Sequence, residues 1–361
     1  MKSRYRLQRH FAEALYHIHG ENNETYLFVA AACFLVVGMQ GVSLAQTSET
    51  AVARAPETQS AVEEQPAAAP ELEKLPNGAA IASCLTPIEG MSCIPGGKFI
   101  RGADDDDHNL HCKQSSYNNR KVKNTYPAAE VWLQTYYMDR TEVTTEAYKA
   151  CVAAKKCVKS GPKYVDFDRP KQPITGISWY EANTYCKAQG KHLPTEAEWE
   201  KAARGPSGDY YPWGNDPVTC ENSVIMDDKK GRSCGVTKRG KGPEKGRVLE
   251  VCSRGAYRYD LCDMIGNAEE WVADWYSPTY EACGEACTGV DPKGPCDGDD
   301  GEKCGKMRAK VVRGGSWYWP VDHATGIHRR SHIASSNPGH HFGFRCAASQ
   351  QEMQKLLEAK K

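Results

Sequence analysis

Residues 192–205 read HLPTEAEWEKAARG, and this stretch carries the clearest structural signal in the chain. Thr195 and Glu198 form a capping box, because the hydroxyl can accept a hydrogen bond from an early backbone N–H while the carboxylate reaches back to the helix start. Gly205 then ends the helix, since glycine readily adopts the conformation that terminates many helices. The stretch predicts one short helix, and capping explains Glu198 better than paired-carboxylate chemistry does.

Two further helices are predicted upstream of this one. Ser178 and Glu181 repeat the capping box, and Gly190 ends the helix that they begin. A third helix is expected from about Thr144 to Lys155.

Downstream of residue 205 the sequence shows no helical period of comparable length until the C-terminal tail. It has short apolar runs, such as residues 310–312 and 343–345, separated by Gly, Pro and Asn. The 32 glycines and 20 prolines favour turns over long regular elements, and no internal repeat is present. We therefore expect a single, loop-rich α+β domain over residues 84–349, followed by a short polar C-terminal helix or tail over residues 350–361.

The N-terminal part of the chain is not typical of a folded domain. Four basic residues within the first nine precede an apolar stretch, YLFVAAACFLVVGMQGVSLA, at residues 26–45. Residues 1–45 thus predict a signal peptide, or an uncleaved signal anchor that spans a bilayer. Residues 46–80 are rich in Ala, Pro and Glu and predict a disordered linker, because they cannot bury enough apolar surface to fold. The expected location is the periplasm, the cell surface or the medium, with the domain free or tethered by the N-terminal segment.

Charge and cysteine content narrow the function classes. The 46 basic and 46 acidic residues cancel, so no net field attracts nucleic acid or an anionic membrane over long range. Membrane contact is expected only through the N-terminal segment. The chain has 16 cysteines, and their density in an exported protein favours disulfides over metal–thiolate sites. Without Cys33 the number is odd, so at least one thiol is free, modified or paired between chains.

Two disulfides are plausible from proximity in the sequence. Cys151 and Cys157 flank a short loop at the end of the predicted helix that starts near Thr144, and Cys220 lies close to Cys234.

Seven motifs in a fixed order identify a family resemblance. They are YMDRTEVT (137–144), PITGISW (173–179), HLPTEAEWEKAARG (192–205), PWGN (212–215), GNAEEW (266–271), RGGS (313–316) and GFRCAA (343–348). Together they resemble the formylglycine-generating enzyme, or sulfatase-modifying factor, family over about residues 93–348. The resemblance implies a variant C-type-lectin-like fold with helices packed on small sheets. It also implies a disulfide between Cys186 and Cys346.

The resemblance further implies calcium as a structural cofactor. Asp263 and Glu270 would donate side-chain oxygens, and Gly266 and Ala268 would donate carbonyl oxygens, which suits an ion that takes six to eight oxygen ligands. Spacing alone favours a surface loop with two solvated acids. A second site would begin at Asn222 and Ser223. There the expected acid falls on Val236, although Asp227 or Asp228 could substitute.

The oxidation chemistry of the family depends on two cysteines shortly after the Gly-Gly-Ser motif, which bind copper(I). Here Trp319 and Ala324 occupy those positions, and no cysteine lies between Cys304 and Cys346. Thiolates are the ligands that suit copper(I), so copper is not expected and no catalytic residue is assigned.

Aromatic and basic residues fill the same segment. One interpretation is a groove that stacks on a peptide or a sugar ring, and the alternative is burial of the rings in the core. The groove residues would be Ser316, Trp317, Trp319, Arg329 and Arg330. Five histidines in the segment could hold copper, zinc or iron, but their spacing matches no metal motif, which favours loop histidines without a metal. They are His323, His328, His332, His340 and His341.

Our leading hypothesis from the sequence is an exported binding or envelope-assembly module, a pseudoenzyme whose ligand is an unknown protein or peptide. The alternatives are an oxidase that makes formylglycine from a protein cysteine, another metal-dependent oxidation, and a carbohydrate-binding domain. The last rests on fold analogy alone.

Overall fold

A computed structural model describes residues 73–104, 124–241, 245–298, 304, 307–335 and 340–360. The predicted N-terminal signal and most of the predicted linker lie outside these residues. Within the described part of the chain, the helices are too short or too polar to cross a bilayer.

The three predicted helices are present. They are α2 (Thr145–Ala153), α3 (Trp179–Ala188) and α4 (Glu196–Arg204), and both predicted capping boxes are formed. Helix α6 (Gln350–Glu358) follows the last strand and begins with a capping box of Ser349 and Glu352. A single turn, α5 (Tyr280–Cys283), and several 3-10 turns lie in the long loop-rich region between α4 and α6.

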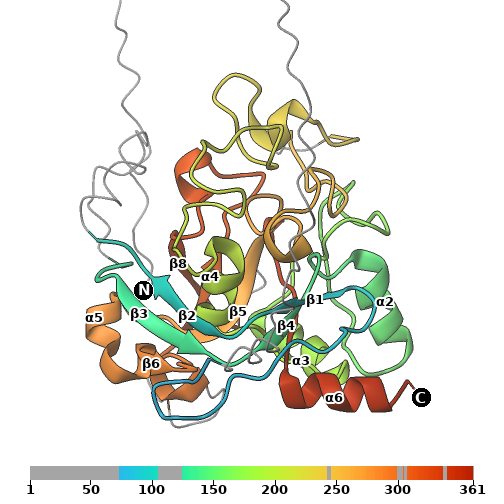
Figure 1. The fold of residues 1–361 in the computed structure, drawn as a ribbon. Coiled ribbons are helices and arrows are strands. Elements are labelled where there is room, and N and C mark those ends of the chain that lie inside the picture. The colour runs from blue at the N-terminus through green and yellow to red at the C-terminus, as the bar shows by residue number, and fades with distance from the viewer. Residues whose placement is uncertain are drawn as a thin grey trace, which may run out of the picture. The chain divides into compact units, whose positions relative to one another are not determined.

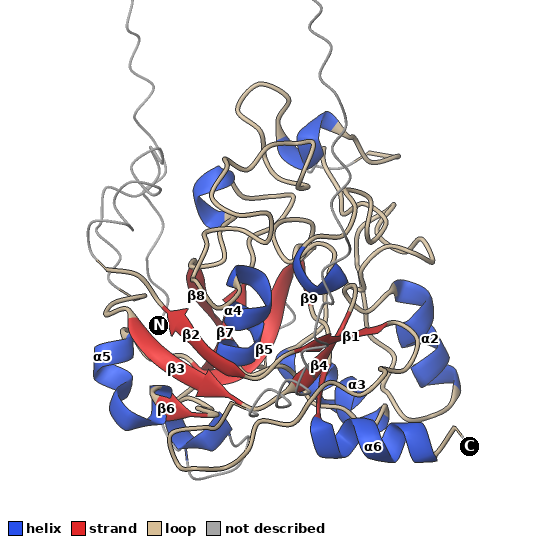
Figure 2. Ribbon diagram, in the orientation of Figure 1, coloured by secondary structure: helices blue, strands red, loops and turns tan. Residues whose placement is uncertain are grey.

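Among the described residues, ten short strands form three small sheets; Figures 1 and 2 show their arrangement. The first has the order β1 (Met91–Ile94), β4 (Tyr136–Asp139), β10 (Ala347–Ser349). The second has the order β2 (Gly97–Arg101), β3 (Ala129–Leu133), β6 (Gly289–Val290). The third has the order β8 (Arg329–Ile333), β7 (Ala309–Arg313), β5 (Glu269–Trp275), β9 (Phe342–Gly343). Small sheets with helices and much irregular backbone agree with the predicted α+β class.

Strand β4 joins the two ends of the domain. It pairs antiparallel with β1, from the start of the domain, and antiparallel with β10, from its end, where Ala347 lies opposite Met138. Helix α6 continues directly from β10 and buries Met353 against Met91 and Tyr137. The chain therefore closes its first sheet only with its last strand.

Helix α4 lies at the centre of the fold, and nearly all of its residues are buried. Trp199 and the alanines pack into the main apolar core. Glu196 of the same helix pairs with the buried Arg313 and Arg329, and Glu200 also pairs with Arg313. Glu200 bonds Arg204 at 2.5 Å and Arg313 at 2.7 Å. Removing one partner of such a pair is costly, because an uncompensated charge remains in the interior. The helix therefore fixes the ends of β7 and β8.

Seven disulfides staple the irregular backbone, and they use all fourteen cysteines of the described residues. Among them are the three that the sequence indicated: Cys151–Cys157, Cys186–Cys346 and Cys220–Cys234. Cys33 and Cys112 lie outside the described residues. This disulfide content fits an exported protein.

The domain begins earlier than the sequence predicted. Leu75 and Ile81 are buried, and the backbone N–H of Ile81 donates to the carbonyl of Glu73 at 3.0 Å. The last residues of the predicted linker therefore belong to the domain. Composition did not reveal this, because two apolar side chains in a polar stretch are too few to mark a boundary.

Candidate functional site

The segment that follows β7 folds as a tight loop over the third sheet. Gly315 has a positive φ of 67°, and a Cβ there would lie 2.5 Å from the carbonyl oxygen of His323. Only glycine permits that approach. The loop buries Ala324 completely and leaves Trp319 half-buried. The positions at which the family resemblance places two thiols are thus filled by a methyl group in the core and an indole ring.

The predicted groove needs correction at three residues. Ser316, Trp317 and Arg329 are buried and cannot contact a ligand at the surface. The Trp317 ring is buried in the core, which was the alternative to the groove, and its indole N–H donates to the carbonyl of His340 at 3.1 Å. Arg329 binds both carboxylate oxygens of Glu196, at 2.6 and 2.7 Å, which satisfies its charge inside the fold.

The half-buried side chains of this segment gather around Trp319. The His323 ring stacks on the indole with centroids 5.2 Å apart, and the His341 ring meets it edge-on at 5.7 Å. The Arg330 guanidinium lies 4.5 Å from the indole centroid and also binds Glu269 at 2.9 Å. We call these five residues, Glu269 included, the Trp319 cluster. Of the predicted groove, Trp319 and Arg330 are the residues that remain within reach of a ligand.

Glu269 is a member of the cluster that sequence reasoning missed. Its side chain is fully buried, and burial raises the pKa of the carboxyl to about 7 although the charge of Arg330 opposes that shift. A carboxyl group poised near neutral pH inside a cationic, aromatic setting is typical of functional sites, although structural ion pairs also produce it. The GNAEEW motif contains Glu269, but only the strand pairing shows which of its two glutamates faces Arg330.

The histidines do not form a recognisable metal centre. Burial lowers the pKa of His341 to about 2 and also lowers the pKa of His323 and His332, so these imidazoles are neutral near pH 7. Neutral imidazoles can bind metals. Within the described residues, however, no group of three or more His, Cys, Asp or Glu side chains is placed to hold a metal ion.

The predicted calcium loop lies deep in the fold beside α4. Asp263 and Glu270 are both buried, but Glu270 binds Arg345 through both oxygens at 2.7 to 3.0 Å. A third buried carboxylate, Glu142, approaches the loop and accepts from the Ala268 N–H at 3.3 Å. Its other oxygen is buried and has no hydrogen-bond partner among the described residues. Three carboxylates thus share one arginine.

This excess of negative charge perturbs the acids. Burial, followed by the charge of Asp263, holds the pKa of Glu142 well above its usual range, and burial raises the pKa of Asp263. A bound cation would relieve that repulsion. Glu142 and Asp263 therefore fit calcium together with carbonyl oxygens, whereas Glu270 would first have to release Arg345.

The side chains of the second predicted calcium site have other partners. The Asn222 side-chain oxygen accepts from the Thr219 N–H at 2.8 Å, and the Ser223 hydroxyl donates to the carbonyl of Ile265 at 2.7 Å. Asp227 accepts from two backbone N–H groups of its own turn. Val224 bridges Gly266, so the two predicted calcium loops are neighbours in space. The Asn222 and Ser223 side chains are thus engaged within the fold, whereas both N–H groups at Asp227 bond one of its two carboxylate oxygens.

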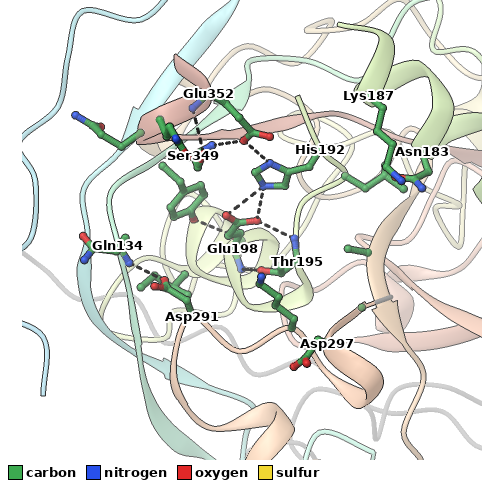
Figure 3. A pocket seen from close by; sticks show the side chains of 18 of the residues that line it. Gln134, Asn183, Lys187, His192, Thr195, Glu198, Asp291, Asp297, Ser349 and Glu352 are labelled. Carbon is green, nitrogen blue, oxygen red and sulfur yellow. Dashed lines mark hydrogen bonds and ion pairs between the residues drawn. The ribbon is translucent and has the colours of Figure 1, made fainter. Parts of the chain in front are cut away.

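A separate pocket of about 810 Å³ lies between α3, the first turns of α4 and α6, and the segment 291–298. Figure 3 shows His192 between Glu198 and Glu352, which are the glutamates of two capping boxes. The ring nitrogens lie 3.2 Å from Glu198 and 2.8 Å from Glu352. Burial alone would lower the His192 pKa, but the two carboxylates outweigh it and raise the pKa to about 10. The charged groups on this part of the pocket wall are thus paired with one another.

The comparisons with known proteins agree with the motifs. The model of the sulfatase-modifying factor enzyme 1-like domain matches residues 78–350. The formylglycine-generating enzyme of Thermomonospora curvata is 30% identical over 295 residues, covering 72% of this chain and 93% of that enzyme. The enzyme of Streptomyces coelicolor is 37% identical over 186 residues, 50% of this chain and 53% of the enzyme.

Solved structures extend the likeness at the level of the fold. PvdO from Pseudomonas aeruginosa superposes with a TM-score of 0.52 at 22% identity, over 71% of this chain and 93% of that chain. Treponema denticola variable protein 1 gives a TM-score of 0.50 at 21% identity, over 72% and 94%. These two structures share the fold of this domain. The family model and the curated relatives show that the chain belongs to the formylglycine-generating enzyme, or sulfatase-modifying factor, family.

Proposed function

We propose that this chain is an exported family domain that has lost the copper-binding thiol pair and acts as a binding or envelope-assembly module. The observation that carries the proposal is the fate of its cysteines. Trp319 and Ala324 stand where the resemblance places the thiols, and every cysteine of the described residues is in a disulfide. Copper(I) needs soft ligands, so the described residues do not fit that ion.

We propose that the Trp319 cluster, in the segment where other family members carry the copper-binding thiols, binds a ligand. An indole flanked by an arginine and two imidazoles offers stacking surface, and the Arg330 guanidinium, which binds Glu269 through Nη1, can also pair with a ligand carboxylate. A protein or peptide segment supplies both kinds of partner. This assignment rests on the half-buried position of Trp319 and Arg330.

Calcium is proposed as a structural cofactor at the loop that contains Asp263, Gly266 and Ala268, with Glu142 as an additional ligand. The unpartnered buried oxygen of Glu142 and the crowding of three carboxylates support it. The ion would neutralise the repulsion and tie the loop to the residues that follow β4.

One assay tests the loss of oxidation directly. The chain is incubated with copper(I), oxygen and a peptide containing Cys-x-Pro-x-Arg, the family's substrate pattern, and the peptide is followed by mass spectrometry. We expect no change in peptide mass and no copper bound to the recovered protein. The Streptomyces coelicolor enzyme, assayed in parallel, is the active control.

An aldehyde product from this chain would contradict the proposal and identify it as an oxidase with other ligands. Metal analysis of the purified protein separates the remaining alternative: a different metal-dependent oxidation requires bound copper or iron, whereas the proposed module holds calcium alone.

A further inference from the structure

One face of the domain concentrates positive charge although the chain as a whole is neutral. Between positions 229 and 247 the sequence contains a single acid, Glu244, among many bases. The bases are Lys229, Lys230, Arg232, Lys238, Arg239, Lys241, Lys245 and Arg247. A second loop beside it, residues 158–171, adds four bases, Lys159, Lys163, Arg169 and Lys171, and contains two acids, Asp166 and Asp168. We call the described residues of these two loops, 158–171 and 229–247 without 242–244, the basic face. It includes the loops coloured yellow in Figure 1, at the end of the domain away from α6.

A single buried carboxylate holds the two loops of the basic face together. Asp166 binds Arg169 at 2.6 Å, lies 3.2 Å from Arg247 and accepts from the backbone N–H of Arg239 at 2.9 Å. Burial and then the like charge of Arg169 lower the pKa of Arg247. One negative charge therefore serves several cations, and the face retains an excess of positive charge that is built into the fold.

Exposed apolar side chains lie among these cations. Val158 and Val165 are 59% and 60% exposed, which places them among the most exposed large apolar residues of the described chain. Val165 packs beside Gly240, where a Cβ would lie 3.3 Å from the valine Cγ1, so the Val165 side chain contacts the other loop. Lys238 lies 5.6 Å above the ring of Tyr164. Lysines around exposed valines and a tyrosine are the composition of a surface that enters a lipid headgroup layer.

We propose that the basic face docks this domain on an anionic lipid bilayer. Each lysine or arginine close to an anionic membrane contributes attraction, and the exposed valines gain by entering the interface. A soluble polyanion would use the cations but would leave the valines in water. The lipid surface is therefore the partner that explains both features.

This proposed membrane contact is additional to the one expected from the sequence, which involves only the N-terminal segment. A net charge of zero excludes long-range attraction of the whole chain to an anionic membrane. Salt, however, screens interactions between charges beyond about 8–10 Å, so a local cluster of cations can attract a nearby membrane whatever the net charge of the chain is. The face also adjoins the loop after β7. Arg232 lies 3.6 Å from the centroid of the Tyr318 ring, and that ring lies 5.0 Å from the Trp319 ring, so the basic face borders the Trp319 cluster.

Hydrogen exchange of the full chain tests the proposal and separates the face from the apolar N-terminal segment. Vesicles of equal parts phosphatidylglycerol and phosphatidylcholine should slow exchange in peptides from residues 158–171 and 229–241, whereas pure phosphatidylcholine vesicles should not. Raised salt should weaken the protection, because part of it is electrostatic.

Charge reversal supplies the decisive variant. Lys229→Glu, Lys241→Glu and Lys245→Glu change exposed side chains that are not used to hold the loops together. The lipid concentration at half-protection should rise at least about a hundredfold, since each lysine contributes ~1 kcal/mol. The matched control carries the same charge change at Lys293, Lys355 and Lys360, exposed residues outside the basic face.

Three results would overturn the proposal. They are equal protection by neutral vesicles, equal weakening in the control variant, and protection by soluble polyglutamate without protection by vesicles. A Val158→Ser, Val165→Ser variant should keep binding at low salt and lose it at raised salt. None of these outcomes depends on the oxidation assay, so the two proposals can fail separately.

Discussion

His192 stabilises two helix starts at once, because its ring lies between the capping glutamates of α4 and α6. Its pKa rises from the ordinary 6.5 to about 10 in the folded chain. The ion pairs therefore stabilise the fold fully below pH 6.5, and this contribution is lost as the pH rises through 10. Glu352, whose pKa falls from the ordinary 4.5 to about 2, keeps its contribution above pH 4.5 and loses it as the pH falls toward 2.

The variant His192→Gln should lose on the order of 1–2 kcal/mol of unfolding free energy at pH 6 and much less near pH 10. This magnitude is discounted for screening, because the side chain is 29% exposed. Urea unfolding at several pH values measures it. Glu352→Gln is the matched variant, and the double variant should cost less than the sum of the two single changes. A pH-independent loss would mean that packing, not charge, is the contribution of His192.

Single residues also show where sequence reasoning about the site reached its limit. The sequence predicts both Trp317 and Trp319 in the groove, but Trp319 is half-buried and Trp317, two places earlier, is a core residue. The two side chains differ only in which way a tight loop turns them. Glu269 and Glu142 were missed because their partners, Arg330 and the 263–270 loop, are distant in the sequence. Tertiary neighbours, which no local pattern encodes, decide such roles.

At the scale of elements, the helices could be predicted and the strands could not. Helices α3 and α4 are bounded by capping boxes and glycine, which are local signals. The strands are two to seven residues long, and β10 pairs with β4 across about two hundred residues of chain. Pairs of that kind depend on the whole fold. The family resemblance predicted that small sheets are present, but the order of their strands is known only from the structure.

The Cys186–Cys346 disulfide joins elements that local contacts cannot hold, since it spans 160 residues between α3 and the start of β10. By the chain-entropy model, the pair Cys186→Ser, Cys346→Ser should cost about 5 kcal/mol of unfolding free energy. Removing Cys151–Cys157, with a separation of 6, should cost about 2 kcal/mol. Denaturant unfolding of the two double variants tests the order, and equal losses would show that loop length does not set the stabilisation.

For the molecule as a whole, the proposed calcium ion should appear as added stability. Chelation should lower the melting temperature, because a ligand bound only to the folded state stabilises it. Differential scanning calorimetry with and without chelator measures the shift. The variants Glu142→Gln and Asp263→Asn should abolish the dependence on calcium, whereas Asp227→Asn, in an exposed turn, should retain it. An unchanged melting temperature on chelation would show that calcium does not stabilise the fold.

Overall charge is a poor guide to this molecule's surface. The formal net charge of zero conceals the basic face, whose residues were present in the sequence as one lysine- and arginine-rich run. What the sequence did not show is that a loop from residues 158–171 folds against that run through Asp166. The local charge density of the face arises only when the two loops meet.

Strand β4 has a consequence for the order in which the protein can mature. Its neighbours β1 and β10 come from opposite ends of the domain, and Cys186 forms its disulfide with Cys346, which lies close to the C-terminal end of the domain. A growing chain therefore cannot complete its first sheet or its longest crosslink before residue 347 has left the ribosome. The domain therefore stays incompletely folded while it is being synthesised, and an unfolded chain is what a secretion channel can transport. The Cys186–Cys346 disulfide can form only afterwards, in a compartment where thiols are oxidised.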